Sequence, residues 1–345
     1  MREILIDLEA LKSNVKQVKA LAGVPILAVV KANAYGHGLI PCSRAIIEAG
    51  ADYLGVALLE EAIAIREAGI TAPVLAWLLP PGEDYKRAVE LNIELGVSSL
   101  AVFDQINAIP GAKIHLEVET GLGRGGFLSE WSELLNRDLS KVIGIFSHFS
   151  KASEPDEEEN KVQIENFEKF LADLKAKDVN PIRHLSNSAA TFKDQRARYD
   201  MVRVGIALYG LPPFGPEKNF KPVMTVRSKL ALVKDLPVNY PIGYSGTERT
   251  KTATKIGIVA MGYGDGIPRN AHGAGVTFEG KAAPMIGRVS MDQFAVDLGA
   301  DSKAQSGDWV TVIGGAFDAY DWAKACQSIT YEITTRIGGR ILRIY

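Results

Sequence analysis

A lysine at the end of an apolar segment is the residue in this sequence best placed to do covalent chemistry. Lys31 directly follows residues 26–30, five apolar residues that are too few for an ordinary helix and typical of a strand buried on both faces. Burial favours the neutral amine, which attacks carbonyl groups. Taken alone, a lysine at the end of a strand more often extends its amine into solvent than does chemistry. Whether Lys31 has a chemical role must therefore be judged from the other residues of the sequence.

Two other residues could act with Lys31: a tyrosine four positions later and an arginine in a glycine-rich segment further along the chain. Tyr35 precedes Gly36 in a loop where glycines let the backbone approach a ligand closely. Arg124 lies in the glycine-rich segment T-G-L-G-R-G-G, and an arginine that folds over a ligand suits a carboxylate or a phenolate oxygen. The alternative for Arg124 is a loop arginine paired with Glu119.

Further polar residues follow apolar segments later in the chain. His148 comes after one such segment, with even odds of a functional or a structural role. Ser188 and the pair Gly205 and Ile206 follow two others, and could offer a hydroxyl group and backbone N–H groups to a phosphate.

Eight short apolar segments alternate with helical patterns over the first 200 or so residues, which predicts a (β/α)8 TIM barrel in the α/β class. In such barrels function lies at the carboxyl ends of the strands, where Lys31, Arg124, His148, Ser188 and Arg203 would lie. The candidate strands are residues 26–30, 53–57, 73–76, 93–97, 113–118, 142–147, 182–185 and 201–204.

The composition changes after Gly210. Residues 211–216, L-P-P-F-G-P, are typical of a linker, and the segments after Val223 are short, β-branched and separated by glycines. We therefore expect two domains, a barrel over residues 1–218 and a mostly β domain over 219–345, with one helical insert near residues 319–325.

Composition excludes several classes of function. The chain has 345 residues, 23% of them charged and 47% hydrophobic, and a formal net charge of -2, so nothing favours nucleic acid or a membrane as partner. Cys42 and Cys326 form neither a ligand-spaced motif nor a disulfide framework, and we expect no metal site. The first residues lack a signal peptide's apolar region, so we predict a cytoplasmic protein.

Residues 29–38, V-V-K-A-N-A-Y-G-H-G, closely resemble the cofactor-lysine signature of the alanine racemases, a fold type III family in which the lysine binds pyridoxal 5′-phosphate (PLP) covalently. Four more segments resemble family motifs, in family order. They are T-G-L-G-R at 120–124, H-F-S-K-A at 148–152, G-Y-G-D-G at 262–266 and G-R-V-S-M-D-Q at 287–293.

The resemblance implies a role for each matched residue. Lys31 would take the proton from the D-isomer and Tyr263 of the partner subunit would take it from the L-isomer, in a two-base mechanism on a substrate joined to PLP by a C=N bond. The cofactor would be bound by Lys31, Tyr35, Arg124, His148, Ser188, Arg203, Gly205 and Ile206. The substrate would be bound by Arg124, Met291 and Asp292.

Arg203 would face the pyridine nitrogen of the cofactor. Because a guanidinium cannot accept a proton, it leaves that nitrogen unprotonated, which suppresses side reactions such as transamination.

Two positions depart from the family pattern. Glu117 stands where many members have a carbamylated lysine, and we expect its carboxylate to support Arg124 through a charge-assisted pair. Gly338 and Gly339 stand where some members have a tyrosine that contacts the phosphate and narrows the entry channel, so a wider entrance could admit larger amino acids.

The resemblance therefore implies a cytoplasmic, homodimeric alanine racemase that supplies D-alanine for peptidoglycan. A racemase of broader range, acting for example on serine or basic amino acids, has the same residues. A barrel-type PLP decarboxylase would need a catalytic cysteine in the β domain, where Cys326 lies outside any motif. A single-domain PLP-binding homeostasis protein would lack Tyr263 and its domain.

Overall fold

The computed structural model describes residues 1–154 and 157–345. They group into two compact units. The barrel unit contains Leu11–Ala34 and Leu39–Lys221, and the β unit contains Met1–Ala10, Tyr35–Gly38 and Pro222–Tyr345. The domain boundary expected at residues 218/219 stays a prediction, and the grouping adds that the first ten residues associate with the C-terminal segment.

Eight parallel strands form the sheet of the barrel unit, in the order β8-β7-β6-β5-β4-β3-β2-β9. All eight predicted strands are present, each shorter by one or two residues, and the predicted fold class is confirmed. The strands are β2 (Ile26–Val29), β3 (Tyr53–Val56), β4 (Val74–Ala76), β5 (Glu94–Val97), β6 (Ile114–Glu117), β7 (Val142–Phe146), β8 (Ile182–His184) and β9 (Val202–Val204).

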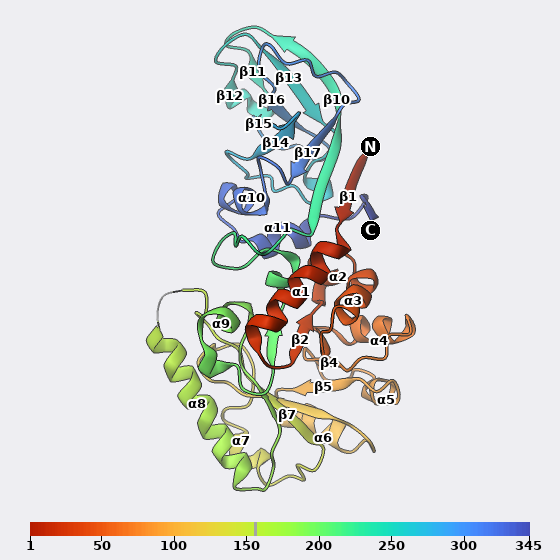
Figure 1. Cartoon of the computed structure of the whole chain (residues 1–345), viewed down its shortest axis with the longest axis vertical. Coiled ribbons are helices and arrows are strands. Elements are labelled where there is room, and N and C mark those ends of the chain that lie inside the picture. The colour runs from red at the N-terminus through yellow and green to blue at the C-terminus, as the bar shows by residue number, and fades with distance from the viewer. Residues whose placement is uncertain (155–156) are drawn as a thin grey trace. The chain divides into compact units, whose positions relative to one another are not determined.

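The sheet curls into a nearly closed barrel. β9 pairs in parallel with β2, and the gap between β8 and β9 is bridged by backbone hydrogen bonds from Asp200 to Arg183 at 3.1 Å and from Arg203 to Ser186 at 2.9 Å. Figure 1 shows α3, α4, α5 and α6 along one side of the barrel strands. The helices are α1 (Leu8–Ala22), α3 (Leu39–Glu48), α4 (Leu59–Glu67), α5 (Tyr85–Glu90), α6 (Leu100–Asn107), α7 (Trp131–Leu134), α8 (Glu157–Lys175) and α9 (Ser188–Lys193), with the 3-10 turns η1 (Gln195–Ala197) and η2 (Ile206–Tyr209).

The barrel strands are buried because helices cover them outside and side chains fill them inside. Every residue of β2, β4, β5 and β9 is buried, as the apolar character of most of them predicts, and the buried residues include two charged ones, Glu94 on β5 and Arg203 on β9. Two glycines make room for neighbouring residues. A Cβ atom at Gly55 would overlap Cδ2 of Leu27 and lie 2.7 Å from the Trp77 ring, and one at Gly96 would lie 2.8 Å from Cβ of Trp77.

The β unit is built on one long strand, β10 (Met224–Leu236), which pairs antiparallel with β1, β13 and β17. The predicted helical insert is α10 (Ala319–Ala325), and α11 (Thr330–Arg336) follows it. The other elements are β1 (Arg2–Ile6), β11 (Pro241–Ile242), η3 (Tyr244–Gly246), β12 (Glu248–Arg249), β13 (Thr254–Val259), η4 (Tyr263–Asp265), β14 (Gly275–Phe278), β15 (Lys281–Ile286), β16 (Phe294–Asp297), β17 (Trp309–Ile313) and β18 (Leu342–Ile344).

The first strand of the chain belongs to this sheet. β1 lies between β10 and β18, antiparallel to the first and parallel to the second, with Arg2 opposite Ser228 and Glu3 opposite Leu342. The two ends of the sequence therefore pair with one another and with the start of the C-terminal segment.

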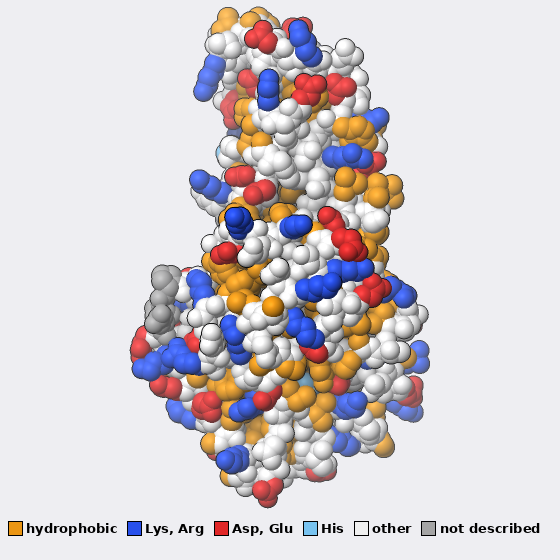
Figure 2. Space-filling model, viewed as in Figure 1, with side chains coloured by type: hydrophobic (Ala, Val, Ile, Leu, Met, Phe, Trp, Pro, Cys, Tyr) orange, Lys and Arg blue, Asp and Glu red, His pale blue; other side chains and the backbone are white. Residues whose placement is uncertain are grey.

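The surface carries mixed charge. Figure 2 shows basic and acidic side chains interspersed over the visible face, as the small net charge implies. Among the described residues, no helix has both the length and the apolar character needed to cross a lipid bilayer.

Candidate active site

Lys31 follows β2 directly and lies at the carboxyl end of the barrel strands. Its amine is partly buried, and burial, together with the positive charges of Arg124 and Arg203, lowers its pKa, while Glu61 opposes the shift. The Nζ atom lies 5.9 Å from the centre of the Trp77 ring. This environment favours the neutral amine that a carbonyl-binding lysine needs.

The backbone after Lys31 is left-handed. α2 (Lys31–Tyr35) contains four consecutive non-glycine residues with φ between 52° and 56°, Ala32, Asn33, Ala34 and Tyr35. L-residues in this conformation cost roughly 1–2 kcal/mol each. The sequence did not predict this strained turn of residues with side chains. The two glycines of the expected loop, Gly36 and Gly38, follow it directly and have φ of 85° and 108°.

Glu61 fixes the start of that turn. Its Oε1 atom accepts a hydrogen bond from the Ala32 N–H at 2.6 Å, and its Oε2 atom accepts from the N–H groups of Ala57 and Leu58 at 3.1 Å each. One carboxylate therefore ties the strained turn to the start of α4. Sequence reasoning missed Glu61 because its partner is 29 positions away.

The loop that carries Arg124 is organised by Glu119. Its two oxygens accept hydrogen bonds from the backbone N–H groups of four successive residues, 121 to 124, at 2.5 to 3.2 Å. Burial opposes ionisation, yet these four bonds hold the pKa of Glu119 below its ordinary value. The alternative of a side-chain pair between Arg124 and Glu119 is therefore wrong, because the carboxylate is used by the backbone.

Glu117 is the last residue of β6, and its carboxylate interacts electrostatically with Arg124 and Arg203. Burial raises its pKa, and the positive charges of Arg124 and Arg203 oppose that shift. Within the described residues, no hydrogen bond or ion pair joins the Glu117 carboxylate to Arg124. Its supporting role stays a prediction that rests on longer-range attraction.

Arg203 is almost completely buried, at 6% exposure, and is held by the carbonyl groups of neighbouring strands. Its Nη2 atom donates to the carbonyl oxygens of Ser147 at 2.5 Å and Leu185 at 3.3 Å, and its Nη1 atom donates to that of His184. In the described part of the chain these contacts use only the terminal nitrogens, which leaves the Nε–H group as a donor for a ligand.

His148 lies against the same guanidinium, with 3.3 Å between its Nδ1 atom and Nη2 of Arg203. Burial and the charges of Arg203, Arg124 and Lys31 lower the pKa of His148 to about 3. The ring is therefore neutral at physiological pH and adds no positive charge to the cluster.

The residues expected at the phosphate adjoin one another after β8 and β9. The Gly205 N–H group donates to the Ser188 Oγ atom at 3.1 Å, and Ile206 begins η2, where helix geometry leaves its N–H group without an intrahelical acceptor. Asn187 caps α9 by accepting from the Ala190 N–H group at 3.0 Å. The structure thus brings together Ser188, Gly205 and Ile206.

Tyr35 belongs to the β unit, where it is 7% exposed. Its ring centre lies 6.0 Å from that of Tyr331 on α11, and burial raises the pKa of both phenols, that of Tyr331 to about 12. Both hydroxyl groups therefore stay protonated and can donate hydrogen bonds.

Tyr263 and Met291 lie side by side on the surface of the β unit. The Tyr263 N–H group donates to the Ser290 carbonyl at 3.0 Å, and the Gly264 N–H group donates to the Met291 carbonyl at 2.8 Å. Tyr263 is 39% exposed and Met291 55% exposed. Two motifs separated in the sequence thus form one exposed pair of turns.

Asp265 anchors these turns from below. Its side chain is fully buried and accepts hydrogen bonds from Arg2 at 2.6 Å, from Arg340 at 3.1 Å and from the Gly262 N–H group at 3.1 Å. Arg340 also pairs with Asp292 at 2.6 Å. The predicted substrate residue Asp292 therefore contacts an arginine of its own chain.

The departure at the C-terminus has a backbone consequence. Gly339 has φ +62°, in the left-handed region that glycine occupies without cost. A tyrosine at this position would be strained even where space allows, so the effect of Gly338 and Gly339 on the entrance stays a prediction.

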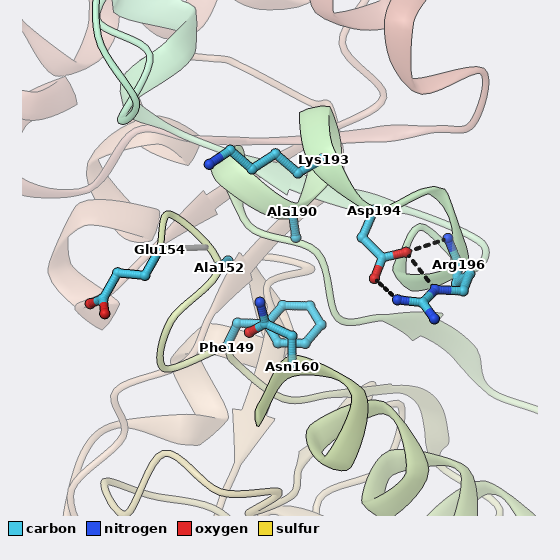
Figure 3. A pocket seen from close by; sticks show the side chains of 8 residues that line it. All are labelled: Phe149, Ala152, Glu154, Asn160, Ala190, Lys193, Asp194 and Arg196. Carbon is cyan, nitrogen blue, oxygen red and sulfur yellow. Dashed lines mark hydrogen bonds and ion pairs between the residues drawn. The ribbon is translucent and has the colours of Figure 1, made fainter. Parts of the chain in front are cut away.

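A cavity of about 580 Å³ lies elsewhere in the barrel unit, after β7 and beside α9 (Figure 3). Phe149 and Asn160 form one wall, and Asp194 pairs with Arg196 at 2.7 Å on another. None of the labelled residues is among those predicted to bind cofactor or substrate.

Known proteins resemble this chain along its whole length. Residues 6–213 match the family model of the alanine racemase N-terminal domain and residues 223–345 that of the C-terminal domain. An alanine racemase of Salinispora tropica is 40% identical, over 99% of this chain and 98% of its own length.

Solved structures agree. The alanine racemase of Streptomyces lavendulae, a D-cycloserine producer, has a TM-score of 0.96 and 40% identity, over 100% of this chain and 96% of its own. The alanine racemase of Bartonella henselae, solved with covalently bound pyridoxal phosphate, has a TM-score of 0.91 and 27% identity, over 100% of this chain and 99% of its own. With both of its domains matched and its fold shared, the chain belongs to the alanine racemase family.

Proposed function

We propose that this protein is a PLP-dependent alanine racemase that interconverts L-alanine and D-alanine. The observation that carries the proposal is the environment of Lys31. A partly buried amine whose pKa is lowered by burial and by two arginines is suited to bind an aldehyde and then to accept a proton.

The residues of the barrel unit fit the cofactor. The Lys31 amine would bind the aldehyde, and the Nε–H group of the buried Arg203 would face the ring nitrogen, since its other nitrogens already have acceptors. The Ser188 hydroxyl group and the Ile206 N–H group would hold the phosphate, and the Gly205 N–H group, which donates to the Ser188 Oγ atom in the structure, would turn to the phosphate when the cofactor binds. By resemblance, Tyr35, Arg124 and His148 would contact the cofactor as well.

The bound cofactor supplies an electron sink that acidifies the Cα–H bond of the amino acid. The protein must then remove a proton from one face and return one to the other, which one group cannot easily do. We assign Lys31 to the proton of D-alanine and Tyr263 to the proton of L-alanine. Arg124 and the N–H group of Met291 would orient the substrate carboxylate, with Asp292 beside them.

We propose further that Tyr263 acts in the active site of a second copy of this chain, in a homodimer. The exposure of Tyr263 and Met291 supports this, because a proton-transferring phenol works best where bulk water is excluded. Both residues need a covering surface that their own turns do not provide.

Mixing two inactive variants tests both the function and the shared site. Lys31→Ala and Tyr263→Phe should each abolish racemisation, measured by chiral chromatography of alanine. After joint unfolding and refolding, half of the dimers are mixed, and each has one site with both wild-type residues, so about a quarter of wild-type activity should return. No recovery on mixing would place both bases in one chain, and an active Lys31→Ala variant would overturn the function itself.

We also propose that the enzyme works in the cytoplasm and supplies D-alanine for peptidoglycan. The family match supports the reaction on which this role depends. Expression of the gene should relieve the D-alanine requirement of a bacterium that lacks its own racemases. Growth that still depends on added D-alanine would contradict the role.

A further inference from the structure

Three buried polar residues of the barrel strands form a chain of contacts that ends at Arg203. Glu94 on β5 lies 2.9 Å from Nε2 of His115 on β6, and Nδ1 of His115 lies 2.9 Å from Nε2 of His184 on β8. On the far side, Nδ1 of His184 lies 3.4 Å from Nη1 of Arg203. We call Glu94, His115 and His184 the histidine chain. No motif in the sequence had indicated it.

The two ends of the histidine chain impose the same direction on its hydrogen bonds. A guanidinium only donates, so the nitrogen of His184 that faces Arg203 must carry no proton. The proton of neutral His184 is then on Nε2 and is donated to Nδ1 of His115. That leaves the proton of His115 on Nε2, where it is donated to the Glu94 carboxylate, which only accepts.

The opposite direction places two donors against each other. With the protons of both histidines on Nδ1, the N–H group of His184 would be aimed at Arg203, which can only donate. Both imidazoles are fully buried, so water cannot relieve that conflict. Burial and the neighbouring His115 and Arg203 also lower the pKa of His184 well below its ordinary value.

The surrounding strands make room for the histidine chain. A Cβ atom at Gly144 on β7 would overlap the His115 ring, so the strand between the two histidines needs a glycine at this position. The register of β6 and β7 shifts beside His115. Phe146 stacks on His184, with ring centres 5.2 Å apart and planes at 17°, and Cζ of Arg203 lies 5.4 Å from the centre of the same ring.

We propose that Glu94, His115 and His184 are positioning residues that hold Arg203 with its Nε–H group aimed out of the barrel toward the bound cofactor. The inference rests on the proposed function only in what Arg203 faces. A row of buried polar groups could be replaced by apolar side chains at little cost in stability, so its presence calls for a role beyond packing. Its direction also leaves no proton for Arg203 to relay to the ring nitrogen.

Nitrogen NMR of the histidine rings tests the direction without any assay of activity. In the holoprotein labelled with 15N-histidine, the ring shifts of His115 and His184 should show neutral imidazoles with the proton on Nε2 at pH 7. The five histidines can be assigned with single substitutions. A cationic ring, or a proton on Nδ1, at His115 or His184 would overturn the proposal, whatever reaction the protein catalyses.

A matched pair of variants tests the positioning. His184→Asn places an amide oxygen where Nδ1 was and keeps an acceptor for Arg203, whereas His184→Gln places its amide where Nε2 was and leaves a methylene opposite Arg203. With a weakened hold on Arg203, the ring nitrogen can take up a proton, and transamination of L-alanine to pyruvate should convert bound PLP to pyridoxamine phosphate.

The expected result is about tenfold more pyridoxamine phosphate per racemisation in His184→Gln than in wild type, with KM for alanine within about twofold. His184→Asn should stay within about threefold of wild type on the same scale. Equal effects of the two variants would show that only packing matters, and no effect of either would also reject the proposal. If a variant fails to fold, the NMR experiment on the wild-type protein still decides.

Discussion

The carboxyl end of the barrel and the exposed turns of the β unit prepare their residues in opposite ways. Around Lys31 the barrel uses burial and like charge, with Arg203 only 6% exposed and the amine pKa lowered. The turn of Tyr263 is open to solvent and is fixed from below by the buried Asp265. Electrostatics thus sets the protonation state of the side chain in the first region, whereas in the second a buried ion pair holds the backbone that carries an exposed side chain.

Because of this difference, substitutions in the two regions should impair the protein in different ways. In the barrel, a substitution that keeps the fold can still change protonation and abolish chemistry. In the β unit, a substitution that keeps the phenol can still misplace it by loosening its anchor. The predictions below separate these outcomes.

The largest effect is expected in the barrel, at Lys31→Ala. Without the amine, the variant should bind PLP only without a covalent bond and should racemise alanine at least about 10⁴-fold more slowly. Absorbance of the protein-bound cofactor and chiral analysis of alanine would measure both. Lys86→Ala, on the exposed face of α5, is the control and should behave as wild type. Substantial activity in Lys31→Ala would remove the contrast between the two regions.

The next effect concerns the anchor in the β unit. Asp265→Asn removes the buried charge that pairs with Arg2 and Arg340, and should lower the free energy of unfolding by about 3 kcal/mol. Asp292→Asn breaks only an exposed pair and should cost less than about 1 kcal/mol. Urea denaturation measures both. Equal losses would mean that burial of Asp265 is not what fixes the turns.

A smaller effect is expected at Glu117→Gln. Loss of the negative charge should leave the positive charges of Arg124 and Arg203 less well compensated. We expect kcat to fall by about tenfold, with PLP still bound. Steady-state kinetics and the cofactor spectrum test this. Full activity would discard the supporting role of Glu117.

The smallest effect is a pH dependence of stability. The pKa of His148 is about 3 in the folded protein and near 6.5 in the unfolded chain. Below about pH 6.5 the unfolded chain therefore binds a proton at His148 that the folded protein does not, and the free energy of unfolding decreases as the pH is lowered. This contributes up to about 1.4 kcal/mol per pH unit. Between about pH 6 and pH 5 the slope should be shallower in His148→Gln than in wild type, and His272→Gln, a substitution at an exposed histidine, is the control. Equal slopes in wild type and His148→Gln would show that His148 is not buried in its neutral form.

The sequence predicted what depends on neighbouring residues. Each barrel strand is a local run of apolar residues, and each motif is a local pattern, so eight strands and the cluster around Lys31 could be anticipated. Pairings between distant positions could not. Glu61 reaches Ala32 across 29 positions, and His115 reaches His184 across 69.

The left-handed turn shows a second limit. Local propensity favours ordinary backbone for Ala32, Asn33 and Ala34, and glycine is the residue expected where φ is positive. Contacts from Glu61, and the hydrogen bond from the Ala34 N–H group to the Val30 carbonyl, override that preference. At these residues tertiary contacts, and not local sequence preference, determine the backbone conformation.

The pairing of β1 with β10 and β18 bears on how the protein is made. Arg2 is translated long before its neighbour Ser228, and Leu342, which pairs with Glu3, is translated later still. At bacterial translation speeds of about 5–20 residues per second, the nascent N-terminus waits roughly 10–45 s for its first strand partner. The barrel can close during that interval, whereas the sheet that carries Tyr263 is completed only once β18 has been translated.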